Sequence, residues 1–224
     1  MPIGSEQLRA RFIQLANQTS VDIWIAGVNA AQGSTFDNVA IVEIGSNFIR
    51  VTNQAGTINA IVPMLPISSV DDAAGPGATP VVNTQSLRSR LIQFVRQFTI
   101  DIYVTGTPNP AITNATVTEV GSDYILVNGT AGGVALTNVY LPLQLLAGFD
   151  SNTATVNNPN ITSTDFRAVL VELSVSNSNV IINLGGRLIA APVQIVEVQS
   201  NFIRLNNTEQ TVAPIFWIGT VQRL

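Results

Sequence analysis

The decapeptide VEIGSNFIRV occupies Val42–Val51, and nearly the same residues, VEVQSNFIRL, return at Val196–Leu205. A third version, TEVGSDYILV, occupies Thr118–Val127 between them. In each version β-branched and aromatic residues flank a short segment containing Ser and Asn or Asp, residues that favour tight turns between strands. The stretch therefore predicts the same β-hairpin three times in one chain.

The repetition extends well beyond the hairpin. Three similar segments follow one another at a spacing of 79 residues, LRARF at Leu8–Phe12, LRSRL at Leu87–Leu91 and FRAVL at Phe166–Leu170. A late proline also recurs, at Pro63, Pro142 and Pro214. Segments rich in Pro, Gly, Asn and Thr separate the repeats, as linkers do. The predicted organisation is module one at 1–70, a linker at 71–83, module two at 84–149, a linker at 150–164 and module three at 165–224.

Within a module, the hydrophobic period changes once. Leu8, Phe12 and Leu15 have the spacing of a short amphipathic helix, and Ile23 and Ile25 then alternate with other residues as in a strand. The hairpin supplies the second and third strands, a fourth leads to the late proline, and a fifth closes the module. Each module is therefore predicted to contain one helix followed by five short strands.

This order of elements, with a Gly-Ser-Asn or Gly-Ser-Asp turn between the second and third strands, resembles the Sm-like small barrel. The pattern VxxVGSDFIxV…GxxxYxPLxxIxxI is similar to Sm-like modules of spore-coat and related proteins in endospore-forming bacteria. A general SH3-like barrel fits nearly as well. The expected fold class is mainly β, with three tandem Sm-like or SH3-like five-stranded small barrels, each with a short N-terminal helix.

The charge balance argues against a nucleic-acid partner. The net charge is −4 and the pI about 4.6, whereas nucleic-acid binders usually carry a basic stripe. The Sm-like resemblance implies an Arg-Gly pair in the loop after the fourth strand, but apolar residues occupy that loop in all three modules. We therefore expect no nucleic acid to bind.

The residue types also argue against catalysis. The chain has no Cys and no His, and all ten of its basic residues are Arg, so the usual nucleophiles and general bases are missing. We expect no enzyme activity, no cofactor and no metal site, and we interpret Asp71 and Asp72 as a solvated pair. Glu43, Glu119 and Glu197 recur at equivalent strand positions, where a structural ion pair with Arg50 or Arg204 across the hairpin is the expected role.

The start of the chain shows no positive segment followed by an apolar one, so no secretory signal is predicted. No apolar run approaches the roughly 20 residues of a membrane span. We expect synthesis in the cytoplasm, with final placement at a spore surface or in another assembled layer.

These exclusions leave assembly as the expected function: a structural subunit that forms a ring, fibre or layer with itself by pairing of strand edges. The predicted contact is the apolar closing strand of module three, at Ile215, Phe216, Trp217, Ile218 and Val221, because no later module follows to cover it. The alternative is a soluble scaffold, or an Sm-like protein that binds RNA or another ligand.

Overall fold

The computed structural model describes residues 5–28, 30–106, 109–184 and 187–224 and is mainly β. Three α-helices occur within these ranges, α1 (Ser5–Ala16), α2 (Leu87–Val95) and α3 (Phe166–Val175). Each begins one module, as the spacing of the apolar residues predicts. None of these described helices is long and apolar enough to cross a membrane.

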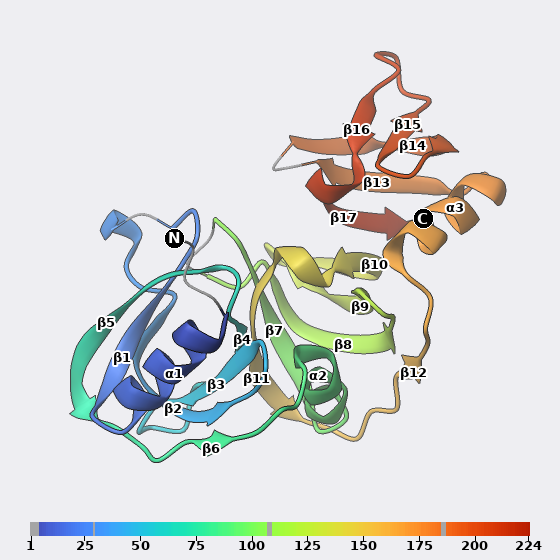
Figure 1. Cartoon of the computed structure of the whole chain (residues 1–224). Helices are drawn as coiled ribbons and strands as arrows, with labels where there is room; N and C mark the ends of the chain where they lie inside the picture. Colours follow the sequence, from blue (N-terminus) through green and yellow to red (C-terminus); the bar gives the residue numbers. More distant parts are fainter. Residues whose placement is uncertain (1–4, 29, 107–108, 185–186) are drawn as a thin grey trace. The chain divides into compact units, whose positions relative to one another are not determined.

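Five strands of module one follow α1: β1 (Thr19–Ile25), β2 (Phe36–Ile44), β3 (Phe48–Thr52), β4 (Asn59–Pro63) and β5 (Ile67–Pro76), with a 3-10 helix η1 (Ala30–Gln32) after β1. They pair antiparallel in the order β5–β1–β2–β3–β4, and α1 packs on β1 and β2 (Figure 1). The decapeptide forms the β2–β3 hairpin, in which Glu43 pairs with Arg50. The hairpin prediction is confirmed.

Modules two and three repeat this order. Module two contains β7 (Phe98–Val104), β8 (Ile112–Val120), β9 (Tyr124–Ala131), β10 (Val134–Pro142), η2 (Leu143–Leu145) and β11 (Leu146–Ala154). Module three contains β13 (Asn179–Leu184), β14 (Arg187–Val198), β15 (Phe202–Leu205), β16 (Val212–Pro214), η3 (Ile215–Trp217) and β17 (Ile218–Arg223). In all three modules the closing strand pairs with the first strand.

The prediction of three closed five-stranded barrels is wrong. In the described residues, β4 pairs with β11 of the next module and β10 pairs with β17, so within each unit the sheet stays open and continues from one module into the next. The physical reason is that β11 and β17 each have two edges. One edge binds the first strand of the same module and the other binds the fourth strand of the preceding module, which leaves no edge to close a barrel.

The segments expected to be linkers are partly strand. β5 continues to Pro76, and the short strands β6 (Val81–Val82) and β12 (Asn160–Ile161) pair in parallel with β2 and β8 of the preceding module. Backbone N–H and C=O groups along those edges are thereby satisfied. Each linker thus forms part of the boundary between two modules.

Contacts divide the chain into two compact units, Met1–Asn114 with Leu146–Val156, and Ala115–Leu145 with Asn157–Leu224. The core of the first unit gathers residues of module one, among them Phe12, and includes Ala147 of module two. The core of the second unit gathers residues of module three and includes Tyr124 of module two. Sharing is expected, because a module of about 60 to 70 residues is close to the lower limit for an independent core.

Candidate assembly interface

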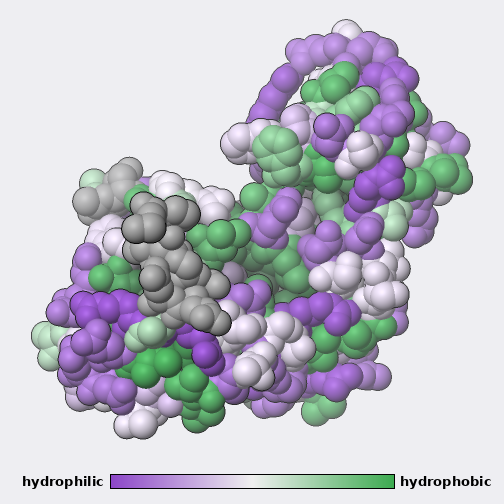
Figure 2. Space-filling view, viewed as in Figure 1, coloured by the Kyte–Doolittle hydropathy of each residue, from purple (hydrophilic) through white to green (hydrophobic). Residues whose placement is uncertain are grey.

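The structure separates the five residues predicted as the assembly contact. Ile218 and Val221 on β17 are completely buried in the core of the second unit, and Ile215 packs against that core. Phe216 and Trp217 on η3 are 58 % and 55 % exposed, with ring centroids 5.5 Å apart. Hydrophobic side chains reach the visible surface of module three among hydrophilic ones (Figure 2).

One premise of the predicted contact is wrong. The prediction required a later module to cover β17, but β10 of the preceding module pairs with one of its edges while β13 pairs with the other. The closing strand is therefore covered within the same chain. Assembly of chains stays a prediction, and its candidate edges lie elsewhere.

The pairing between modules occurs twice in the same register. At the first boundary Ile61 of β4 pairs with Phe149 of β11, and at the second Tyr140 of β10 pairs with Val221 of β17. Ile61 and Tyr140 each stand two positions before the late proline of their module, while Phe149 and Val221 each stand seven positions after theirs. The boundary between modules is thus itself a repeated structure.

Close packing supports the first boundary. The N–H of Asn59 donates to the carboxylate of Asp150 at 2.8 Å, and burial raises the pKa of Asp150 to about 6 against the opposing effect of its backbone hydrogen bonds. A Cβ atom on Gly148 would lie 2.7 Å from the ring of Phe36, so the strand approaches at this point only because no side chain intervenes. Phe36 also contacts the ring of Tyr103, at 4.9 Å between centroids.

A second contact recurs at both boundaries, between the hairpin turn of one module and the start of the next helix. The side-chain oxygen of Asn47 accepts the N–H of Leu87 at 2.7 Å, and that of Asp123 accepts the N–H of Phe166 at 2.7 Å. The first N–H groups of a helix have no partner inside the helix. Each hairpin turn therefore helps to cap the helix of the following module.

Serine in the same turns adds a further hydrogen bond. The N–H of Ser46 donates to the carbonyl of Gln85, and that of Ser122 donates to the carbonyl of Thr164, each at 2.9 Å. The serine hydroxyls contact the same two carbonyls. The Ser-Asn and Ser-Asp pairs of the opening stretch thus hold successive modules together as well as forming the turn.

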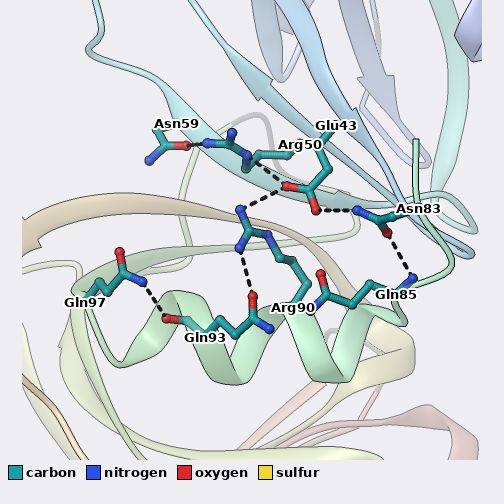
Figure 3. A network of polar contacts seen from close by, with 8 residues as sticks. All are labelled: Glu43, Arg50, Asn59, Asn83, Gln85, Arg90, Gln93 and Gln97. Atoms are coloured by element: carbon teal, nitrogen blue, oxygen red, sulfur yellow. Dashed lines mark hydrogen bonds and ion pairs between the residues drawn. The ribbon is translucent and has the colours of Figure 1, made fainter. Parts of the chain in front are cut away.

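An ionic network lies at the first boundary (Figure 3). The carboxylate of Glu43, only 8 % exposed, lies 3.2 Å from Arg50 across the hairpin and 2.9 Å from Arg90 on α2. It also accepts a hydrogen bond from Asn83 at 3.0 Å. A buried carboxylate is stable only when it is paired and hydrogen-bonded, which three donors from two modules achieve here.

The equivalent acids of the other modules have different partners. Glu119 accepts hydrogen bonds from Tyr124 and from Asn160, and burial together with the bond to Glu119 raises the pKa of Tyr124. Glu197 lies 3.0 Å from Arg204, and hydrogen bonds from Gln199 and Arg204 lower its pKa. The predicted ion pairs with Arg50 and Arg204 across the hairpin are confirmed.

Sequence reasoning missed the role of Arg90 and of the linker strands. Arg90 gave a signal, because it lies on the second helix at the position that Arg11 occupies on the first. The partner of Arg90 could not be read from the sequence, since Glu43 lies 47 positions earlier in the chain.

The polar groups at the boundaries between modules are strand edges, helix caps and arginine–carboxylate pairs. Among the residues that the structure describes, no group of three or more His, Cys, Asp or Glu is placed to hold a metal ion. Strand edges, helix caps and arginine–carboxylate pairs are the groups by which one protein surface recognises another. Comparisons with protein-family models, with curated proteins and with solved structures find no match, so the chain is assigned to no family.

Proposed function

We propose that the chain is a structural, self-assembling subunit that joins further chains head to tail into a ring, fibre or layer, such as a spore-surface layer. The carrying observation is the repeated pairing of a fourth strand with the closing strand of the next module. In the described residues, β16 pairs only with β15 and β5 pairs only with β1. One fourth strand and one closing strand thus have an open edge.

The internal register identifies the residues that would meet. Val212 stands two positions before Pro214, as Ile61 does before Pro63, and Val70 stands seven positions after Pro63, as Phe149 does after Pro142. Val212 of one chain therefore pairs with Val70 of a second chain. Val212 is 58 % exposed, and neither edge carries the lysine that often protects an open strand.

Burial differences support the same contact. A groove of about 450 Å³ lies between α1 and β5. Its lining is half apolar, with Leu8, Phe12 and Val70 among the apolar residues, and half polar, with Arg11, Asp71 and Asp72 among the charged ones. Leu87 and Phe149, which match Leu8 and Val70, are 7 % and 0 % exposed where a preceding module covers them. The groove is therefore the surface that module three of another chain would cover. The Sm-like resemblance, which implies assembly through fourth and fifth strands, agrees with this choice.

Phe216 and Trp217 do not take part in the proposed head-to-tail contact. Phe216 stands two positions after Pro214, as Leu65 does after Pro63 in module one. Leu65 is 86 % exposed even though module two follows it in the chain. Head-to-tail pairing would therefore leave the aromatic pair exposed. Its apolar area remains for contacts between neighbouring rings or fibres.

Light scattering and negative-stain microscopy of the purified chain test the proposal. We expect particles larger than one chain, and Val212→Lys or Val70→Lys should reduce their size while circular dichroism stays unchanged, because a charge on an edge strand opposes pairing. Val156→Lys, at a residue 99 % exposed outside the edges, is the control. A wild-type chain that is monomeric at about millimolar concentration would refute the proposal.

Head-to-tail contacts between identical chains use two different surfaces, so they close into a ring or continue as a filament. The scaffold and RNA-binding alternatives have less support, because they do not use the open edges and the pI is about 4.6.

A further inference from the structure

The hairpin turn of module three differs from its two counterparts in contacting no helix of a following module within the described residues. In modules one and two, the turn contacts the segment leading into α2 or α3. In module three, Gln199, Ser200 and Asn201 are all exposed, and the described chain beyond them contains only the strands of module three and η3. The turn thus presents the same groups without the helix that they bind elsewhere.

Exposure along the turn shows the same difference. Phe48 and Tyr124, which follow the turns of modules one and two, are 0 % and 1 % exposed. Phe202 at the same position is partly exposed, and Val196 on the adjoining strand is 42 % exposed. The counterparts of Phe202 are thus covered at both internal boundaries, whereas the surface of module three, residues 196–202, is uncovered within the described residues.

The acid in this surface has only part of the ionic network found around Glu43. Glu197 pairs with Arg204 just as Glu43 pairs with Arg50. Glu43 has a second cation, Arg90 from the next module, and is 8 % exposed, whereas Glu197 is 33 % exposed. The missing partner is therefore an arginine from the helix of a following module.

The chain carries that arginine on α1. Arg11 occupies the position of Arg90 at a spacing of 79 residues, and Arg11 bonds to Gln14 at 2.7 Å as Arg90 bonds to Gln93 at 3.1 Å. Arg11 is exposed. The equivalent residue of α3 is Val169, and Glu119 accordingly binds Tyr124 and Asn160 instead of an arginine. Helix α1 therefore matches the requirement of Glu197 and α3 does not.

The sequence before the helices repeats as well. Ile3, Val82 and Ile161 each precede the first apolar residue of a helix, Leu8, Leu87 or Phe166, by five positions. Val82 and Ile161 lie in the strands β6 and β12 that line the internal boundaries. The spacing between this apolar residue and the helix is thus the same in all three sequence repeats.

We propose that residues 196–202 of module three bind α1 of a second chain, with Arg11 pairing with Glu197. This inference rests on the proposed head-to-tail assembly and names a second, polar part of its contact. Strand edges alone can pair in more than one register. The ion pair joins two specific residues, so it selects which ends meet and fixes the register.

Charge reversal tests the contact. Arg11→Glu alone brings two carboxylates together at the interface, and Glu197→Arg alone brings two guanidinium groups together there. Each single variant should raise the concentration for half-assembly at least about 30-fold, because an interface charge then faces a like charge. Arg96→Glu, an exposed residue at the end of α2, has the same change in charge as Arg11→Glu and is the control.

Two combinations should restore assembly. In an equimolar mixture of the single variants, every contact of an alternating arrangement joins opposite charges. In the double variant, which carries Arg11→Glu and Glu197→Arg in one chain, every contact again joins opposite charges with their positions exchanged. Recovery in both combinations identifies the pair as a contact between chains.

The outcomes separate this inference from the proposed function. If the wild-type chain assembles and both single variants assemble equally well, the polar contact is wrong while edge-strand assembly stands. If the double variant assembles but the mixture does not, Arg11 and Glu197 pair within one chain and the second-chain contact is overturned. If the wild-type chain does not assemble, the proposed function itself fails.

Discussion

Replacing Asp150 with Asn should stabilise the first unit at neutral pH. The carboxyl of Asp150 is buried at the boundary between modules one and two, where it accepts the N–H of Asn59. Asn keeps an oxygen that can accept this bond but has no charge to desolvate. The variant therefore removes the cost of a buried carboxylate and retains its structural contact.

The pKa of Asp150 gives the magnitude and the sign. Burial raises it from 3.8 to about 6 in the folded protein, so between these values the folded state holds more protons than the unfolded state. Stability from this group is complete below pH 3.8 and is lost as the pH rises to about 6. A shift of about two units corresponds to about 3 kcal/mol at pH 7, and residual hydration reduces the expected gain in Asp150→Asn to about 1–2 kcal/mol.

Urea denaturation, followed by the fluorescence of Trp24 on β1 of the same unit, measures this difference. The variant should exceed wild type by about 1–2 kcal/mol at pH 7 and match it near pH 4. Asp72→Asn, at an exposed carboxylate on β5, should show no such pH dependence. A difference that does not change between pH 4 and pH 7, or a loss of stability at pH 7, would refute the reasoning.

Two further predictions follow from the boundary and from the charge balance. Arg90→Leu should lower the free energy of unfolding of the first unit by about 1–3 kcal/mol in the same urea assay, because Glu43 keeps only one of its two cations. The control, Arg96→Leu, should change it by less than about 0.5 kcal/mol. An effect of Arg90→Leu no larger than that of its control would show that the network is not stabilising. Filter binding with poly-U and poly-A at low salt should detect no tight complex, since phosphate contacts are strongest there, and salt-sensitive sub-micromolar affinity would contradict the expectation.

The local elements were predictable because neighbouring residues determine them. The apolar spacing of Leu87, Leu91 and Phe94 produces a helix, and Gly45-Ser46-Asn47 sets the hairpin, whichever module comes next. The pairing of Glu43 with Arg50 followed from their facing positions in that hairpin. The decapeptide therefore showed the hairpin and its ion pair, and its recurrence predicted the repetition of these elements.

The closure of each module was not determined locally. Any strand edge offers the same backbone donors and acceptors, so a single module cannot specify whether β4 pairs within its own module or with β11. The apolar character of Ile218 and Val221 indicated burial but did not identify β10 as the strand that covers them. For the same reason, the sequence of residues 196–202 indicates only a hairpin. The contacts that the two equivalent turns make with α2 and α3 indicate that this surface can bind a helix.

The sequence by itself determined the repeated helices and hairpins and the acidic residue in each hairpin, because these depend on short-range spacing and turn chemistry. Only the tertiary structure decided that the fourth strand of one module joins the closing strand of the next and that Arg90 pairs with Glu43. It also decided that, within the described residues, β5 and β16 each have one unpaired edge. These features depend on which strand edges and charges come into contact after the chain has folded. Local sequence patterns do not specify contacts between residues that are far apart in the chain.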